Sequence, residues 1–378
     1  MAILRQLISE PWLWTEYYSE PAAGNVPPLI LDARFSMKTR CFDHLICAAL
    51  ISFALMSHNC LAADAEQTST WHDPSSHSIR FVPVDKDVRV EVLDWGGTGR
   101  PLVLLAGLGN TAHVYDDIAP KFAVKYHVYG ITRRGFGASS SPSSGYTANR
   151  LGDDVVEVLD ALKIVHPLLV GHSIAGEELS SVANRYPTRI AGLVYLDAGY
   201  LYAYQNPASK DLAPELAALQ DRVEQLMPPA PPTDADLTNF STVRSWRMRN
   251  QGVAVPEAEL RQTLETAPDG HITRPHTQQA ISQAIQAGEQ KFTDIRVPIL
   301  AIYAIPHNFG NAFSKLTDKE RSEIEVRETA TLGAIAKSFQ SGLPSAHVVW
   351  LRANHYVFLS NEQDVVRETN AFIDSLPK

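Results

Sequence analysis

Ser173 is the residue whose surroundings in the sequence most favour nucleophilic chemistry. It lies in the stretch Gly171-His172-Ser173-Ile174-Ala175, between a short apolar run and a segment with helical spacing. Small residues two positions before and two after a serine let a strand and a helix meet at a sharp turn that presents the hydroxyl. Ala175 stands where that pattern has its second glycine. An ordinary strand-to-helix turn containing a serine is the alternative interpretation.

A serine hydroxyl needs a general base at neutral pH, and His355 is our candidate. The chain has 13 histidines, so most of them must serve other purposes. His355 stands out because the segment 353–356 lies between the last predicted strand and the last predicted helix. His172 is next to Ser173, but we expect its side chain to point away across the turn.

The carboxylate that would orient His355 has several candidates. Asp197 follows an apolar run and lies between the serine and the histidine, which keeps the chain order Ser, Asp, His. A turn or a helix cap is the alternative role for this aspartate. Glu177 and Glu178, on the predicted helix after Ser173, are rival carboxylates.

Backbone N–H groups would stabilise the negative oxygen that forms when a serine attacks a carbonyl group. The glycine-containing turn 106–110 follows the first buried strand, and a turn at this position can aim an N–H group at that oxygen. The second donor would be the residue directly after the nucleophile. We therefore expect the oxyanion hole to consist of the backbone N–H groups of Leu108 and Ile174.

The elements expected around these residues alternate between strands and helices. Two strands with alternating polarity, 80–84 and 88–95, form a predicted hairpin, and continuous apolar strands follow, as in a parallel sheet buried on both faces. These apolar strands are expected at 102–106, 128–131, 168–170, 190–196 and 299–304, with a last strand at 347–351. Helices are expected at 151–162, 174–185 and 365–376. This order predicts an α/β fold with a mostly parallel central sheet and flanking helices.

Residues 200–291 interrupt the alternation. They contain no convincing strand and carry helical patterns at 213–226, 235–250 and 278–292, with a proline-rich joint at 228–232. We interpret this region as a helical cap insertion on the sheet, not as an independent domain. Its aromatic and methionine side chains either line an apolar pocket or hold the insertion to the sheet.

The first 65 residues carry the pattern of an export signal. A basic stretch at 37–40, an apolar run at 45–56 and small residues at 61–65 are the three parts of a secretory signal peptide. The apolar run is shorter than the about 20 residues that a membrane span needs. We expect a signal peptide over 37–65 and a periplasmic or secreted mature domain over 66–378 without a stable membrane span. Residues 1–36 would then precede the true start, with a genuine extension as the alternative.

Composition excludes several classes of function. The net charge of −9 argues against a nucleic-acid partner. All three cysteines, Cys41, Cys47 and Cys60, lie in the predicted signal, so the mature chain would have no disulfide and no thiol nucleophile. The scattered histidines and the lack of a glycine-rich nucleotide loop predict neither a metal nor another cofactor. The sequence does not indicate an oligomeric state.

From about Arg80 to its C-terminus, the chain resembles the α/β-hydrolase superfamily. The likeness includes the GHSIAG turn, the oxyanion turn, the RRGFGAS segment and the ANHYVF segment around the histidine. It is most similar to capped esterases and lipase-like hydrolases. Ala106 replaces the histidine usual in the family before the oxyanion glycine, and the segment 305–310, where most members carry the acid, has no carboxylate. Other members carry the acid after the preceding strand, at the position of Asp197.

The resemblance implies a serine hydrolase that cleaves a small-molecule carboxylic ester through an acyl-enzyme. Ser173 would be the nucleophile, His355 the base and Asp197 the acid that orients it. Related enzymes of other classes carry aspartate at the nucleophile position, and Ser173 argues against them. Two alternatives stay open: a non-catalytic small-molecule binding protein on the same fold, and a cofactor-free acyltransferase or perhydrolase that uses the same residues.

Overall fold

The computed structural model describes residues 71–228, 230–277 and 279–377. The described residues from Pro74 onward belong to one compact unit. The predicted upstream extension (1–36) and signal peptide (37–65) lie outside the described residues. None of the helices in the described ranges combines the length and the apolar character that crossing a membrane requires.

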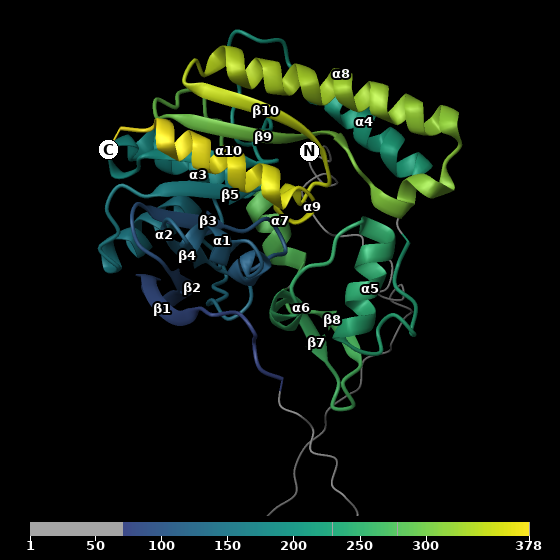
Figure 1. The fold of residues 1–378 in the computed structure, drawn as a ribbon, viewed down its shortest axis with the longest axis horizontal. Coiled ribbons are helices and arrows are strands. Elements are labelled where there is room, and N and C mark those ends of the chain that lie inside the picture. The colour runs from purple at the N-terminus through teal and green to yellow at the C-terminus, as the bar shows by residue number, and fades with distance from the viewer. Residues whose placement is uncertain (1–70, 229, 278, 378) are drawn as a thin grey trace, which may run out of the picture. The chain divides into compact units, whose positions relative to one another are not determined.

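An eight-stranded sheet forms the centre of this unit (Figure 1), with the strand order β1-β2-β4-β3-β5-β6-β9-β10. β1 and β2 are antiparallel to their neighbours. The other six strands of this sheet, β4, β3, β5, β6, β9 and β10, are parallel to one another. The strands are β1 Ser78–Asp85, β2 Val88–Gly96, β3 Pro101–Leu105, β4 His127–Ile131, β5 Leu168–His172, β6 Gly192–Leu196, β9 Ile299–His307 and β10 Ala346–Ala353. The predicted mostly parallel α/β sheet is therefore confirmed.

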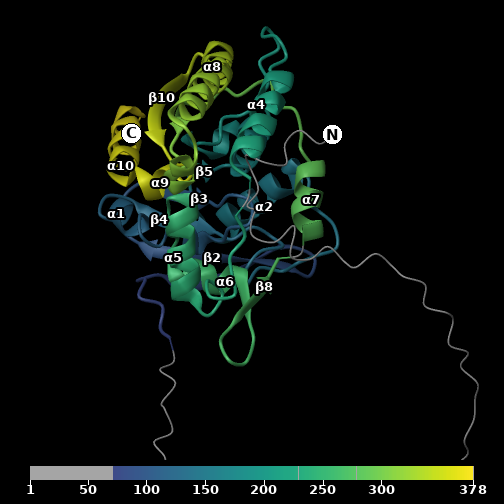
Figure 2. The same ribbon diagram turned by 90° about the vertical axis from the view of Figure 1, so that its right-hand side faces the viewer.

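Helices cover both faces of the sheet, which is why its central strands are apolar on both sides. Along β3, Val103 and Leu105 belong to one core cluster, and Leu102 and Leu104 to the other. The first cluster lies under α2 Ala148–Ala161, α3 Ala175–Arg185 and α8 Asp318–Gly342; the second lies under α1 Ala119–Ala123, α9 Val357–Ser360 and α10 Glu362–Ser375. Figure 2 shows α10 and α1 on one side of the strands and α2 on the other.

The segment between β6 and β9 is mostly helical, but it contains two strands that the sequence did not predict. Its elements are α4 Ala213–Leu226, α5 Phe240–Gln251, α6 Glu257–Thr263, β7 Leu264–Thr266, β8 Ile272–Pro275 and α7 Gln279–Ala287. β7 and β8 pair as an antiparallel hairpin around Asp269 and Gly270. Strands of three and four residues are too short to display an alternating pattern, so the expectation of no strand in this region was wrong.

The 25-residue helix α8 was also not predicted. Its first turn is a capping box, in which the Thr317 side chain accepts from the Glu320 backbone and the Glu320 side chain accepts from the Thr317 backbone. A threonine followed three residues later by a glutamate is the local signal that could have revealed this helix. Its buried residues, among them Ile324, Leu332 and Phe339, are spread among charged ones, which hides the helical period.

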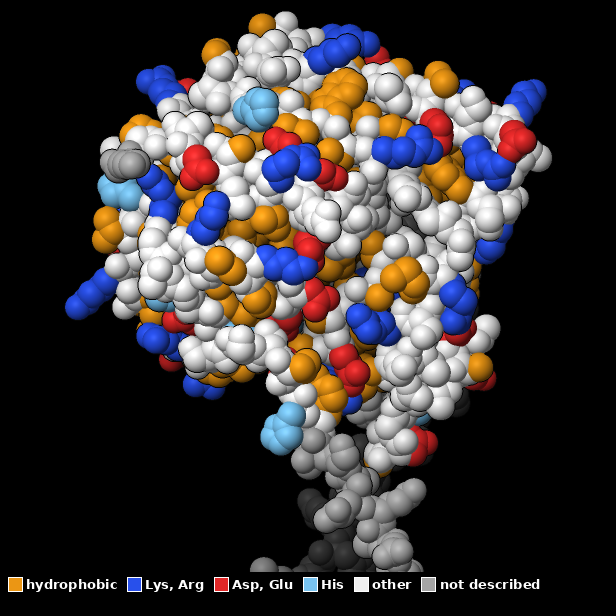
Figure 3. Space-filling view, viewed as in Figure 1, with side chains coloured by type: hydrophobic (Ala, Val, Ile, Leu, Met, Phe, Trp, Pro, Cys, Tyr) orange, Lys and Arg blue, Asp and Glu red, His pale blue; other side chains and the backbone are white. Residues whose placement is uncertain are grey.

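The surface over α8 and α10 mixes charges of both signs. In the view of Figure 3, Lys and Arg side chains lie among Asp and Glu side chains across this face. Several of these groups form ion pairs, for example Arg352 with Glu325 and Arg367 with Asp364. A mixed surface of this kind carries no extended field of one sign.

Candidate active site

Adjacent parallel strands bring the predicted site residues to one edge of the sheet. β3, β5, β6, β9 and β10 are neighbours in that order, so their carboxyl ends lie together. His172 at the end of β5 is level with Leu196 at the end of β6, and Leu196 is level with Ile302 on β9. Ser173 and Asp197 come directly after the two strand ends. In open α/β sheets this edge is where ligands bind.

Ser173 lies in a sharp turn with a backbone φ of +53°, a conformation that L-residues other than glycine rarely adopt. Its N–H donates to the Leu196 carbonyl at 3.2 Å, and its own carbonyl accepts from the Gly176 N–H at 2.9 Å. A Cβ atom on Gly176 would overlap with the Ala198 carbonyl oxygen. Position 176 therefore requires glycine, and it directly follows Ala175, which stands where the sequence pattern has its second glycine.

The Ser173 side chain is enclosed. The residue is 1% exposed, and its Oγ has no hydrogen-bond partner among the described residues. A hydrogen bond from Ser173 to His355 is therefore not formed in this structure. Such bonds are often long or misaligned in ligand-free hydrolases and tighten when substrate binds.

His355 and Asp197 are in direct contact. His355 Nδ1 lies 2.6 Å from Asp197 Oδ2. The other oxygen of this carboxylate, Oδ1, accepts from the Tyr200 hydroxyl at 2.6 Å and from the Ala304 N–H at 2.9 Å. Burial alone would raise the pKa of Asp197, but the contacts with His307 and His355 lower it well below its usual range. Asp197 is therefore a buried, ionised carboxylate.

His172 lies against the histidine segment, so it takes part in the site more closely than its sequence position suggested. Its ring centroid is 4.6 Å from that of His355, and its Nε2 lies 3.1 Å from the His355 carbonyl oxygen. Burial, together with the nearby His355, lowers the pKa of His172 well below its usual value. His172 is therefore a neutral donor that fixes the backbone of His355.

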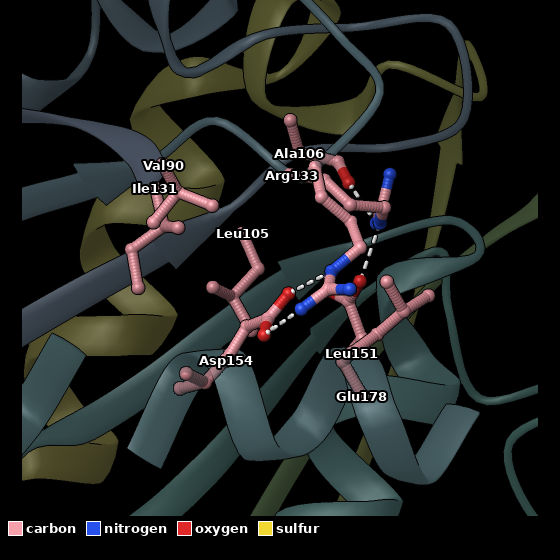
Figure 4. A pocket seen from close by; sticks show the side chains of 10 residues that line it. Val90, Leu105, Ala106, Ile131, Arg133, Leu151, Asp154 and Glu178 are labelled. Carbon is pink, nitrogen blue, oxygen red and sulfur yellow. Dashed lines mark hydrogen bonds and ion pairs between the residues drawn. The ribbon is translucent and has the colours of Figure 1, made fainter. Parts of the chain in front are cut away.

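The rival carboxylates have other surroundings. Glu178 binds the Arg133 guanidinium, which also donates to the carbonyls of Ala106 at 2.7 Å and Gly107 at 3.2 Å. Figure 4 shows Arg133 between Glu178 and Ala106, in the wall of a small pocket behind the site. Both carboxylate oxygens of Glu177 are buried without a partner among the described residues, and burial raises the pKa of Glu177 well above its usual value. Asp197 is the carboxylate that contacts His355 in the described part of the chain.

Leu108 and Ile174, the predicted oxyanion residues, are both buried. Their loops lie close together, because a Cβ atom on Gly107 would be 3.3 Å from the Ser173 Cβ. The structure thus brings the turn after β3 and the turn after β5 side by side, with the backbone of 107–108 beside the serine.

The turn 106–110 after β3, where the sequence predicts the oxyanion hole, is tied to α6 and to the histidine segment. Glu259 on α6 accepts from the Asn110 side chain at 3.0 Å and from the Thr111 N–H at 3.1 Å, and it also binds the Thr111 hydroxyl. Tyr356, next to His355, donates its hydroxyl to Asn110 Oδ1 at 3.1 Å. Burial is the main reason that the pKa of Glu259 is raised to about 7, against the lowering effect of these hydrogen bonds.

The cap also touches the segments after β9 and β10. Asn354 donates to the Gln251 carbonyl at 2.7 Å and to the Asn308 carbonyl at 3.1 Å. A Cβ on Gly252, the left-handed residue that ends α5, would lie 3.1 Å from the Gly310 Cα. These contacts, together with Glu259, tie α5 and α6 to the loops at this edge of the sheet.

Two residues in the site, His307 and Glu328, were missed by sequence reasoning. His307 ends β9, where the family resemblance placed an acid that this chain lacks. His307 Nε2 lies 3.0 Å from Asp197 Oδ2, and its Nδ1 lies 2.9 Å from Glu328 Oε1 on α8. The lack of a carboxylate at 305–310 was the signal available, but α8 was not predicted, so nothing pointed to Glu328.

Two groups of side chains place potential metal-binding atoms close together, although the spacing of histidines in the sequence predicted none. One contains His77, His113 and Asp116, and the other contains Asp197, His307 and His355. In the second group the nitrogens that face the carboxylates are already used in hydrogen bonds. A metal there would have to displace those bonds, so this group fits a proton-binding network better than a metal site.

Residues 100–304 match the family described as alpha/beta hydrolase fold. This match covers more than half of the chain, so the protein belongs to the α/β-hydrolase family. Relatives named hydrolases support an enzyme of this broad class.

Individual relatives resemble only part of the chain. It is 31% identical over 105 residues to 3-oxoadipate enol-lactonase 2 of Acinetobacter baylyi, which is 28% of this chain and 39% of that protein. It is 27% identical over 101 residues to 2-(acetamidomethylene)succinate hydrolase of Mesorhizobium japonicum, 27% of this chain and 36% of that protein. The matched stretch thus spans well under half the length of these relatives.

Solved structures extend the likeness of the fold. The structure of E-2-(acetamidomethylene)succinate hydrolase superimposes with a TM-score of 0.55 at 18% identity and covers 79% of this chain and all of that one. A bromoperoxidase from Bacillus anthracis gives a TM-score of 0.51 at 18% identity, with 79% and 100% covered. At such low identity the likeness concerns the fold alone.

Replacing Glu259 by glutamine should reduce the loss of stability at alkaline pH. Burial raises the pKa of Glu259 to about 7, above that of a carboxyl group in the unfolded chain. The folded protein therefore binds the extra proton, and its free energy of unfolding should fall as the pH rises from about 5 to about 8. Glutamine carries no charge at any pH, so the variant should lose less stability over this range. Chemical denaturation at both pH values measures the difference, and Glu257→Gln, which pairs with Arg261 on the same helix, should keep the wild-type pH dependence. An equal fall in Glu259→Gln and the wild type would contradict this prediction.

Proposed function

We propose that the protein is a serine hydrolase that cleaves a carboxylic ester through an acyl-enzyme intermediate. The observation that carries this proposal is the 2.6 Å contact between His355 and the ionised Asp197, beside a serine in a turn with φ of +53°. A nucleophile, a base and an acid at the carboxyl ends of parallel strands in one sheet are the parts that acyl transfer needs.

The proposed reaction uses each group in turn. Ser173 Oγ attacks the ester carbonyl carbon while His355 takes the hydroxyl proton, and Asp197 stabilises the imidazolium that forms. The backbone N–H groups of Leu108 and Ile174 stabilise the oxyanion. His355 then gives its proton to the leaving alcohol. Finally it activates a water molecule, which releases the acid and restores Ser173.

Access to the serine requires movement of the cap in this proposal. Ser173 is 1% exposed beneath contacts from α5 and α6. Tyr200, Tyr202 and Trp246 are each at most 4% exposed, and the tyrosines belong to the core cluster on the sheet. This favours the interpretation that these aromatic residues attach the insertion to the sheet over the interpretation that they line an open pocket.

The name of one relative supports an ester as the substrate class, because a lactone is a cyclic ester. A second candidate function is acyl transfer to an alcohol or to peroxide. The partial likeness to a relative named putative non-heme haloperoxidase, 34% identical over 103 residues, supports testing peroxide as an acceptor. The same three side chains would serve both reactions and differ only in the acceptor. Product analysis with water alone, with added alcohol and with added hydrogen peroxide separates them.

Replacing Ser173 by alanine should lower ester hydrolysis by several orders of magnitude, because the variant has no nucleophile. The measurement is turnover of p-nitrophenyl esters of increasing chain length, together with labelling by a fluorophosphonate probe. Ser181→Ala, which removes a buried hydroxyl from α3, the helix that follows Ser173, should keep both activity and labelling. Near-normal turnover by Ser173→Ala would contradict the serine mechanism. Bound but uncleaved esters in the wild type would instead favour a binding protein.

Replacing Asp197 by asparagine should lower kcat by about four orders of magnitude, the cost of the same change in the triad of a serine protease, with a much smaller change in KM. The amide cannot stabilise the His355 imidazolium. Glu177→Gln removes a buried carboxylate that has no described partner and should cost far less. Thermal unfolding of each variant separates loss of chemistry from loss of fold. A mild Asp197→Asn combined with a severe Glu178→Gln would move the acid to α3.

We also propose that the protein is exported and cut near Ala63 or Ala65, since small residues precede signal cleavage sites. Intact mass and N-terminal sequencing of the protein from the cells that make it should show this cut and no titratable thiol. Ala49→Arg, which puts a charge into the apolar run, should keep the protein inside the cell. A mature protein that still contains Cys60 would contradict the proposal.

A further inference from the structure

The Asp197 carboxylate serves two imidazole rings at once. His355 Nδ1 lies 2.6 Å and His307 Nε2 lies 3.0 Å from the same oxygen, Oδ2. The ring centroids of His307 and His355 are 6.2 Å apart. A charge on His307 therefore changes the electrostatic environment of both Asp197 and His355.

His307 lies between two carboxylates. Its Nδ1 is 2.9 Å from Glu328 Oε1, and its backbone N–H donates to Glu328 Oε2 at 3.0 Å. His307 and Glu328 are 3% and 1% exposed, so water supplies little compensation. A neutral imidazole has one N–H, so it can donate to only one of two ionised carboxylates, whereas an imidazolium can donate to both.

The pKa of His307 agrees with a ring that donates to both carboxylates. Burial alone would lower the pKa of His307, but the Glu328 and Asp197 carboxylates outweigh it and raise that pKa to about 10. The charges thus alternate along the chain of contacts: negative on Glu328, positive on His307 and negative on Asp197, with His355 at the end.

We propose that His307 is a positioning residue that Glu328 holds in its charged form. It fixes Asp197 and reduces the stabilisation that Asp197 gives to protonated His355. The kinetic part of this inference rests on the proposed function. A cation next to Asp197 repels the proton that His355 would take up, so His355 stays neutral, and able to act as a base, to a lower pH. Glu328 stabilises that cation without contacting His355.

The other titratable groups around Asp197 and His355 are neutral near neutral pH. They are His172 from β5, Tyr200 and Tyr202 after β6, and Tyr303 on β9. Burial lowers the pKa of His172 and raises the pKa of each of the three tyrosines. His307 is therefore the group in this described set that carries a positive charge.

A purely structural role is the competing interpretation, because the same contacts join α8 to the end of β9. The two roles differ in one measurable respect. A purely structural contact affects the free energy of unfolding and the maximum value of kcat/KM. A charge next to Asp197 also affects the pH at which kcat/KM declines on the acidic side.

Two substitutions remove the charge in different ways. In His307→Gln the amide can still donate to Asp197 but carries no charge. In Glu328→Gln the amide oxygen can accept from the backbone N–H of His307. The amide nitrogen then donates to His307 Nδ1, which must be unprotonated, so the ring keeps a single proton on Nε2. In both variants we expect the acidic limb of the kcat/KM profile to move to higher pH by about one unit or more.

The matched control is Glu323→Gln. Glu323 lies on the same helix as Glu328 and pairs with Arg222 at 2.8 Å. This substitution removes the same charge from α8 without touching His307, so the pH profile should equal that of the wild type. An acidic limb that stays in place, or moves to lower pH, in both test variants would overturn the proposal even if their activity falls.

Nitrogen-15 NMR of histidine-labelled protein gives a second readout that needs no substrate. The wild-type full chain should show His307 with both nitrogens protonated at pH 8.5, and this signal should be lost in His307→Gln and become that of a neutral ring in Glu328→Gln. Burial alone would lower the pKa of His113, but Asp116 and Glu91 raise it to about 10, so His113 should give a second doubly protonated signal that both variants keep. If His307→Gln does not fold, the wild type and Glu328→Gln still decide the question. A neutral His307 in the wild type at pH 8.5 would overturn the inference. Absence of ester turnover alongside a charged His307 would contradict the proposed function and leave the charge assignment standing.

Discussion

The buried carboxylate of Asp197 is the interaction on which the rest of the site depends. Its two oxygens receive donors from the segment after β6, from the backbone and the end of β9, and from the segment after β10. An ionised carboxylate with no exposed surface is unfavourable unless it is fully hydrogen-bonded. These donors satisfy that requirement and at the same time hold three loops in fixed positions.

This arrangement tolerates backbone conformations that would be unfavourable elsewhere. Both Ser173 and Asp197 have positive φ values, +53° and +46°. Residues of this kind cost on the order of 1 kcal/mol or more each and persist where the surroundings determine them. The Ser173 N–H donates to the Leu196 carbonyl and the Asp197 N–H donates to the Ile302 carbonyl, so each strained residue is tied to the next strand of the sheet.

Buried polar groups also join the site to the elements around it. Arg133 holds the carbonyls of the turn after β3, Glu259 holds the same turn from the cap, and Tyr356 connects that turn to the histidine segment. Each of these links leaves a buried group unpaired if one partner is removed. Helix α6, the turn after β3 and the histidine segment are therefore joined in one network of buried polar contacts beside Ser173.

The amino-acid sequence by itself determined the α/β sheet, each of the eight strands in it, and the candidates Ser173, His355 and Asp197. It could do so because apolar runs buried on both faces, and a serine between small residues at a strand-to-helix turn, are local patterns. Helix α8 escaped because its buried residues are diluted among charged ones, and β7 and β8 escaped because they are too short to show a period.

Only the tertiary structure decided which carboxylate meets His355 and what lies behind that carboxylate. Chain order favoured Asp197 over its rivals Glu177 and Glu178, but the contact with His355 depends on where α3 and β6 lie after packing. His307 and Glu328 are 21 residues apart in sequence and meet because α8 folds back over β9. The charge of a buried imidazole depends on partners brought from distant segments, and no local pattern of residues contains that information.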